Sequence, residues 1–195
     1  MEVKKIKIFL ASSKELQEDR KQFEIEIYRK CKMWIDMELF LHLDIWEDLS
    51  SRMSKTSSQE EYNKNVKGCD LFILLASTKV GMYTAEEFEQ AFGEFKAKKK
   101  PFIFTYFKQV AGTLEPSLQQ FKKNLEGLGH FYAMYQDSND LWNQFNKELE
   151  RLHSEDFDKN NWKKLKNRKD TTVDNQVANI KNQFIGGKFD NPTFN

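Results

Sequence analysis

The sequence has few cysteines, no long apolar run and no excess of charge of either sign, and each shortage excludes a class of protein. Two cysteines, Cys31 and Cys69, are too few for a disulfide framework and lack the spacing of a metal site. No stretch approaches the roughly 20 apolar residues that span a bilayer, and the apolar run after Lys5 is too short for a signal peptide. Lysine and arginine (31) nearly balance aspartate and glutamate (30), which argues against binding to nucleic acid or to a membrane. We therefore expect a cytoplasmic protein.

The familiar catalytic signatures are missing as well. The three histidines, His42, His130 and His153, pair with no nucleophile and with no cysteine, so no metal site is expected. The first strand-like run is not followed by a Gly-x-Gly-x-x-Gly turn, and the chain has no P-loop. These absences exclude a Rossmann dehydrogenase and a P-loop nucleotidase. What remains is a site centred on a carboxylate, with no expected cofactor.

Five strand-like runs alternate with amphipathic helical segments along the first 153 residues. The predicted strands are 5–11, 39–45, 71–76, 101–107 and 131–135, and the predicted helices are 14–32, 59–67, 84–98, 117–128 and 141–152. The run 71–76 is apolar throughout, as in a central strand covered on both faces. This order predicts an α/β fold with a five-stranded, mostly parallel sheet and helices on both faces.

Composition divides the chain into three parts. We predict a compact domain over residues 1–153 and a polar linker or loosely docked extension over 154–175. The stretch 176–195 regains apolar residues and is either a disordered tail or a short element for partner binding or self-association.

The best-placed carboxylate is Glu87, in a helical segment just past the central strand. The spacing of the apolar residues puts Glu87 at the edge of the buried face and points Glu86 toward water. A structural alternative is strong, because Thr84-Ala85-Glu86-Glu87 has the pattern of a capping box, in which Glu87 bonds back to the Thr84 amide. The local sequence alone favours the cap.

Four further residues follow predicted strands, where ligands of parallel sheets bind. Trp46 and Tyr83 offer rings on which a base or nicotinamide stacks, although core packing explains either one alone. Ser12 and Ser13 offer hydroxyls for a phosphate or ribose near a helix start, but helix capping explains them equally well, with Glu15 completing a box from Ser12.

Several motifs, taken in order, resemble a bacterial TIR (Toll/interleukin-1 receptor) domain. They are Lys7-Ile8-Phe9-Leu10-Ala11-Ser12-Ser13, Trp46-Glu47-Asp48, Cys69-Asp70-Leu71-Phe72-Ile73-Leu74-Leu75, the segment Tyr83 to Ala91, and the run Lys100 to Lys108. The resemblance covers residues 4 to 153 and implies a flavodoxin-like TIR fold, in which the loop after the second strand corresponds to the BB loop. Enzymatic members carry an aromatic residue four positions before a catalytic glutamate, a pattern met here by Tyr83 and Glu87, with tyrosine in place of the usual tryptophan.

The resemblance implies an NAD-cleaving enzyme. Glu87 is then the catalytic carboxylate, and Ser12, Ser13, Trp46 and Tyr83 bind the substrate NAD. The implied setting is antiphage defence, by NAD depletion or by an ADP-ribose-type signal, with TIR–TIR self-association and a separate sensor or effector protein as partners. Two alternatives remain open: a non-catalytic TIR–TIR interaction module, and an enzyme that resembles the nucleoside deoxyribosyltransferases.

Overall fold

One parallel sheet contains every strand of the residues that the structure describes. The structure is a computed structural model, and it describes residues 3–45 and 65–155. The strands are β1 (Lys4–Ser12), β2 (Leu39–Asp44), β3 (Leu71–Ala76), β4 (Phe102–Lys108) and β5 (Ala133–Tyr135), in the order β2-β1-β3-β4-β5. All neighbouring pairs are parallel. This order is that of flavodoxin-like folds, which confirms the predicted α/β class.

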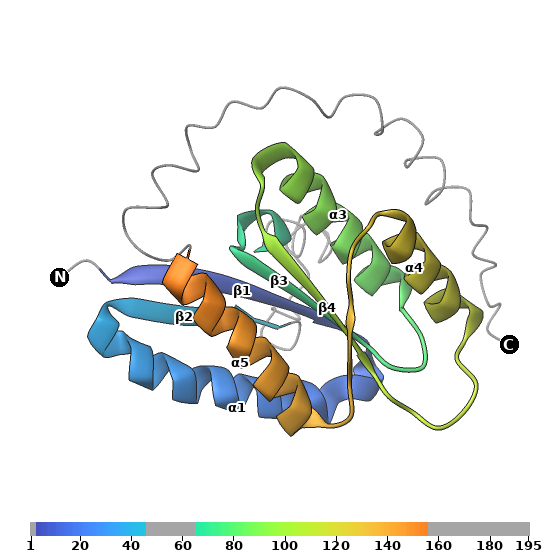
Figure 1. Ribbon diagram of the computed structural model, residues 1–195, viewed down its shortest axis with the longest axis horizontal. Coiled ribbons are helices and arrows are strands. Elements are labelled where there is room, and N and C mark those ends of the chain that lie inside the picture. The colour runs from blue at the N-terminus through green and yellow to red at the C-terminus, as the bar shows by residue number, and fades with distance from the viewer. Residues whose placement is uncertain (1–2, 46–64, 156–195) are drawn as a thin grey trace, which may run out of the picture. The chain divides into compact units, whose positions relative to one another are not determined.

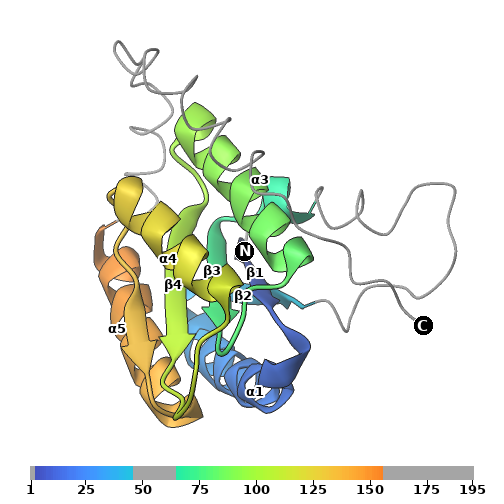
Figure 2. The ribbon, with the colours of Figure 1, turned by 90° about the vertical axis from the view of Figure 1, so that its right-hand side faces the viewer.

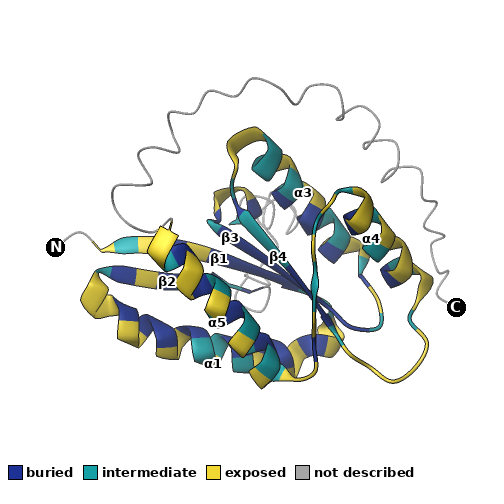
Figure 3. Ribbon diagram, viewed as in Figure 1, coloured by how far each residue is buried: buried dark blue, intermediate teal, exposed yellow. Residues whose placement is uncertain are grey.

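The centre of the sheet is β3, whose six residues are all buried. Its register places Leu71 beside Ile8 of β1 and beside Phe102 of β4. Figure 3 shows buried residues along β1 and β3, in the middle of the layers. The unbroken apolar run therefore marks a strand covered on both faces, as the sequence predicted.

Helices cover both faces of the sheet (Figures 1 and 2). On one face, Phe23 of α1 (Gln17–Trp34) contacts Trp142 and Phe145 of α5 (Ser138–Glu155). On the other, Phe88 of α3 (Met82–Lys98) packs edge-on against Phe121 of α4 (Pro116–Gly127). Each helix buries an apolar stripe against the sheet, which is what fixes its position.

The chain divides into two compact units, Met1–Glu148 and Leu149–Asn195. The first unit contains the whole sheet. Of the second unit, the structure describes residues 149–155, which continue α5 as helix. The predicted linker over 154–175 and the tail over 176–195 lie almost entirely outside the described residues. None of the described helices is both long and apolar enough to cross a membrane.

The start of α1 differs from the prediction. A capping box from Ser12 to Glu15 would begin a helix at Lys14, but Lys14–Leu16 form a short 3-10 turn, η1, and α1 begins at Gln17. The box is absent because the Glu15 carboxylate accepts hydrogen bonds from Ser13 Oγ and from Thr78, 63 residues away. Thr78, which is distant in sequence, therefore binds the Glu15 carboxylate that the local pattern had assigned to the cap.

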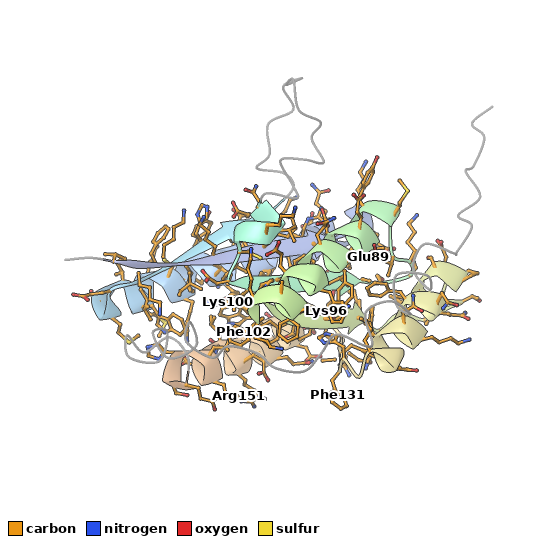
Figure 4. The ribbon with its side chains drawn as sticks, turned by 90° about the horizontal axis from the view of Figure 1, so that it is seen from above. Glu89, Lys96, Lys100, Phe102, Phe131 and Arg151 are labelled. Atoms are coloured by element: carbon orange, nitrogen blue, oxygen red, sulfur yellow. The ribbon has the colours of Figure 1, made fainter. Side chains whose placement is uncertain are left out.

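The last helix begins earlier than its apolar pattern indicates, at Ser138 rather than Leu141. Asp137 explains the difference, since its Oδ1 accepts hydrogen bonds from the amides of Asn139 and Asp140, both at 2.9 Å. In contrast, β5 is shorter than predicted. It begins at Ala133, and the side chain of Phe131 projects away from the fold and is 93% exposed (Figure 4).

Candidate functional site at the carboxyl edge of the sheet

The candidate site lies where the strands end and the connections to the helices begin. In flavodoxin-like folds ligands bind outside the carboxyl ends of the strands. Here the ends of β1 and β3 are adjacent, because Ser12 pairs with Leu75. The connection after β1 carries Ser13, and the connection after β3 leads into α3 with Tyr83 and Glu87. The topology therefore brings four of the five predicted site residues to one edge.

Glu87 is more deeply buried than its predicted edge position suggests. Its side chain lies in the second turn of α3 on the face that packs on the sheet, and the residue is 7% exposed. Burial, and to a smaller extent the neighbouring negative charge of Glu86, raise the pKa of its carboxyl from 4.5 to about 8. Among the described residues, no donor pairs with this carboxyl. A buried acid of this kind is a candidate functional group.

The structure contradicts the capping alternative for Glu87. The residue that precedes α3 is Gly81, which has an extended backbone (φ −68°, ψ 154°), and the helix begins at Met82. Thr84 is therefore already inside the first turn and is buried, and Ala85 donates its amide to the Gly81 carbonyl at 3.0 Å. Glu87 makes no bond back to Thr84, so its burial has no capping role.

Tyr83 lies one turn before Glu87, on the same side of α3, and its ring is 61% exposed. An exposed ring next to a buried carboxyl suits a ligand that stacks and carries a positive charge. Glu86 is half-buried rather than fully turned toward water, whereas Glu89 is exposed on the outside of the helix (Figure 4). The helix thus presents one buried acid at its beginning and solvated acids around it.

Ser12 and Ser13 do not cap a helix with their side chains. Ser12 Oγ accepts a hydrogen bond of 2.7 Å from the buried guanidinium of Arg20, which also donates to the Ser13 carbonyl at 2.7 Å. Ser13 Oγ donates to Glu15 at 3.1 Å. Arg20 therefore holds the turn after β1 in place. The fifth predicted residue, Trp46, lies outside the described residues, as does the serine-rich loop that follows it.

Sequence reasoning missed two polar clusters at this edge. In one, Lys108 at the end of β4 donates to both oxygens of the buried Asp19, at 3.1 and 2.8 Å, and Ser138 Oγ adds a third contact at 3.3 Å. In the other, Glu15 binds the backbone amide and the hydroxyl of Thr78. No local pattern identifies such partners, since each pair joins residues far apart in sequence.

The opposite edge of the sheet has a structural cluster. Asp70, part of the TIR-like motif before β3, accepts hydrogen bonds from the Lys7 amide at 3.0 Å and from Lys100 Nζ at 3.2 Å. Lys100 and Phe102 mark this edge in Figure 4. Because Asp70 joins the middle of β1 to the starts of β3 and β4, its presence in the motif is explained by the fold.

A metal site is not evident in the described part of the chain, where no group of three or more His, Cys, Asp or Glu side chains is placed to hold an ion. Both cysteines are buried free thiols, and burial raises the pKa of the Cys69 thiol to about 12. His130 bonds to the hydroxyl of Thr105 at 3.1 Å, and burial lowers its pKa. The ionisable group that stands out at the carboxyl edge is therefore Glu87.

Comparison with family models and with curated proteins gives no match. Among solved structures, the chain is similar to the CMP N-glycosidase BcmB of Clostridium botulinum, with a TM-score of 0.46, 18% identity, and coverage of 72% of this chain and 98% of that one. It is also similar to a conserved protein from Enterococcus faecalis V583, with a TM-score of 0.40, 14% identity, and coverage of 74% and 99%. At these scores and identities neither likeness carries an argument about function.

Proposed function

We propose that this chain is a TIR-type enzyme that cleaves the nicotinamide–ribose bond of NAD, with Glu87 as the catalytic carboxylate. The observation that carries the proposal is the placement of Glu87: a buried acid with a raised pKa, just past the central strand and one helical turn from an exposed aromatic ring. The reaction itself is inferred from the resemblance of the motifs to TIR domains, and the chemistry of the site is compatible with it.

In the proposed reaction the bond between ribose C1′ and the pyridinium nitrogen breaks, and its electron pair goes to that nitrogen. Nicotinamide then leaves as a neutral molecule, so no general acid is needed. The positive charge that develops on the ribose is stabilised by ionised Glu87, whose effect is large in a site with little water. Capture of C1′ by water, with loss of a proton to solvent, gives ADP-ribose, and capture by an atom of the same molecule gives a cyclic isomer.

The raised pKa has a consequence for this reaction. At pH 7 the free protein holds Glu87 mostly protonated, since its pKa is about 8. The pyridinium cation of NAD favours the ionised form and lowers the pKa in the complex. Because kcat/KM reports the free enzyme, we expect it to rise about tenfold per pH unit up to pH 8 and then level off. The inflection of kcat should lie at lower pH.

The decisive experiment follows nicotinamide release by the purified protein at high concentration, which permits assembly. Glu87→Gln, which keeps the shape and removes the charge, should lose at least about 100-fold in kcat. Glu89→Gln, an exposed acid on the same helix, is the matched control and should retain activity. Full turnover by Glu87→Gln, or none by the wild-type protein in any assembly state, contradicts the catalytic assignment.

We further propose a role in antiphage defence, with self-association through TIR–TIR contacts and a separate sensor or effector protein as partner. Tyr83, Ser12 and Ser13 are proposed to bind NAD, together with Trp46. Separation of the reaction products by chromatography distinguishes ADP-ribose from a cyclic isomer, and therefore NAD depletion from signalling.

A second candidate is a non-catalytic interaction module. It is favoured by three large apolar side chains near the end of α1, Met33, Ile35 and Met37, which are 66%, 44% and 46% exposed. Light scattering over a range of concentrations tests it. Concentration-dependent assembly that Met33→Lys abolishes, in a protein that releases no nicotinamide, would replace the catalytic proposal with this one.

A further inference from the structure

Glu15 joins two connections at the carboxyl edge, which follow the neighbouring strands β1 and β3. It lies in η1, directly after β1, and its partner Thr78 lies two residues after the end of β3. Glu15 Oε1 accepts from the Thr78 amide at 3.1 Å, and Oε2 accepts from Thr78 Oγ1 at 2.7 Å. Two parallel bonds fix orientation as well as distance. We refer to this pair as the Glu15–Thr78 clamp.

The amide, the hydroxyl and the carbonyl of Thr78 all form hydrogen bonds. Beyond its amide and hydroxyl, its carbonyl accepts a hydrogen bond of 3.0 Å from the amide of Glu115, the residue that precedes α4. The connections after β1, β3 and β4 therefore meet at one residue. A residue bonded in this way has little freedom to shift relative to the strand ends.

The clamp lies four residues before the start of α3. From Thr78 the chain reaches Gly81 in three residues, and Val80 between them is buried in the core, so the path is short and fixed at both ends. Tyr83 and Glu87 follow in the first two turns of α3. On the other side of the clamp, the Ser13 hydroxyl donates a hydrogen bond to Glu15 at 3.1 Å.

Folding stability gives only a weak reason for the clamp. Glu15 is exposed, and its hydrogen bonds are open to solvent. Bonds of this kind contribute about 1 kcal/mol or less to stability. In contrast, a displacement of about 1 Å in a catalytic site costs on the order of 100-fold in rate. We therefore expect the loss of these two bonds to lower the rate of the proposed reaction more than the stability of the fold.

We propose that Glu15 is a positioning residue, which acts through Thr78 to set the distance between the turn after β1 and the start of α3. The proposal rests on the proposed function, since it assigns Glu15 to the reaction of Glu87. Glu15 itself does not touch the reacting atoms. Its role is to hold Ser13 on one side of the substrate and Tyr83 and Glu87 on the other.

The test uses four variants of the full chain. Glu15→Ala removes both acceptors, and Thr78→Val removes the hydroxyl but keeps the amide and the β-branched shape. Thr78→Ser restores the hydroxyl. Glu18→Ala is the matched control, because Glu18 is an exposed acid nearby whose bond of 2.9 Å goes to Lys21 on the same helix.

The first readout is turnover of NAD. We expect Glu15→Ala and Thr78→Val to lower kcat about 10- to 100-fold with KM within twofold, while Thr78→Ser and Glu18→Ala stay near wild type. The double variant Glu15→Ala/Thr78→Val should be no worse than Glu15→Ala, because both changes break one contact. Wild-type kcat in Glu15→Ala, or additive losses in the double variant, overturns the proposal.

The second readout does not depend on activity. Hydrogen–deuterium exchange of residues 77–83 should be about two- to fivefold faster in Glu15→Ala than in wild type, with exchange of β3 unchanged. Unchanged exchange in 77–83 overturns the clamp whatever the activity. If wild type releases no nicotinamide, the proposed function fails, and faster exchange in Glu15→Ala still establishes that Glu15 holds the start of α3.

Discussion

Replacing Glu87 by glutamine should stabilise the fold, and by an amount that grows with pH. The carboxyl has a pKa of about 8 in the folded chain, against an ordinary value of 4.5. Below pH 4.5 Glu87 is protonated in both the folded and the unfolded chain, so folding does not bury a charge. Between pH 4.5 and 8 the unfolded chain loses the proton that the folded chain keeps, so the wild-type protein loses stability as pH rises. Glutamine is neutral at every pH, so the Glu87→Gln variant does not lose stability in this way.

The magnitude follows from the two pKa values. Each pH unit between them corresponds to about 1.4 kcal/mol. The free energy of unfolding of Glu87→Gln should therefore exceed that of wild type by about 1 kcal/mol at pH 5, about 3 kcal/mol at pH 7 and about 5 kcal/mol at pH 9. The two side chains differ little in size, so packing adds a constant offset and the slope with pH isolates the charge.

Urea unfolding at the three pH values, followed by tryptophan fluorescence, to which the buried Trp34 contributes, measures these differences. Glu18→Gln serves as control, since the Glu18 side chain is 84% exposed and its replacement should change stability by less than about 0.5 kcal/mol at every pH. A difference between Glu87→Gln and wild type that is the same at pH 5 and pH 9 would refute the reasoning, because it would mean that Glu87 ionises as readily in the folded chain as in the unfolded one.

Three further predictions follow from contacts at the same edge. Glu86→Gln should lower the pKa of Glu87, because it removes the second cause of the shift, and the inflection of kcat/KM should move to lower pH. Tyr83→Ala should raise KM for NAD about 2- to 10-fold by loss of stacking, with stability in urea within about 0.5 kcal/mol of wild type because the ring is exposed. Asp19→Ala should destabilise the fold by about 2 kcal/mol in the same assay, since it leaves Lys108 without its buried partner.

The features that could be predicted from sequence are those set by neighbours along the chain. The apolar run of β3 has its predicted bounds, and the other described strands differ from prediction by one or two residues at an end. Alternating strands and helices also gave the parallel sheet, because parallel neighbours require a crossover. The periodicity of α3 correctly distinguished Glu87 from Glu86, although it underestimated the burial of Glu87.

The features that could not be predicted depend on partners far apart in sequence. Both capping boxes were wrong: Glu15 bonds to Thr78 across 63 residues, and α3 begins at Met82, preceded by Gly81, rather than at Thr84. The pair of Asp19 and Lys108, 89 residues apart, had no sequence signal at all. A local pattern states which bonds a side chain is able to make, and the tertiary fold decides which of them forms.

The described acids of the sheet edges fall into two kinds, and the contrast bears on the role of Glu87. Glu15, Asp19 and Asp70 each accept hydrogen bonds from an amide, a hydroxyl or a lysine, and each joins elements that the fold must hold together. Glu87 is buried like Asp19, with 7% of the residue exposed against 2%, but it has no donor among the described residues, and burial raises its pKa instead. If Glu87 had only a structural role, glutamine or leucine at this position would give a more stable fold. Glu87 instead lowers the stability of the fold at neutral pH, and we propose that its charge serves the reaction, in which it faces the pyridinium ring of NAD.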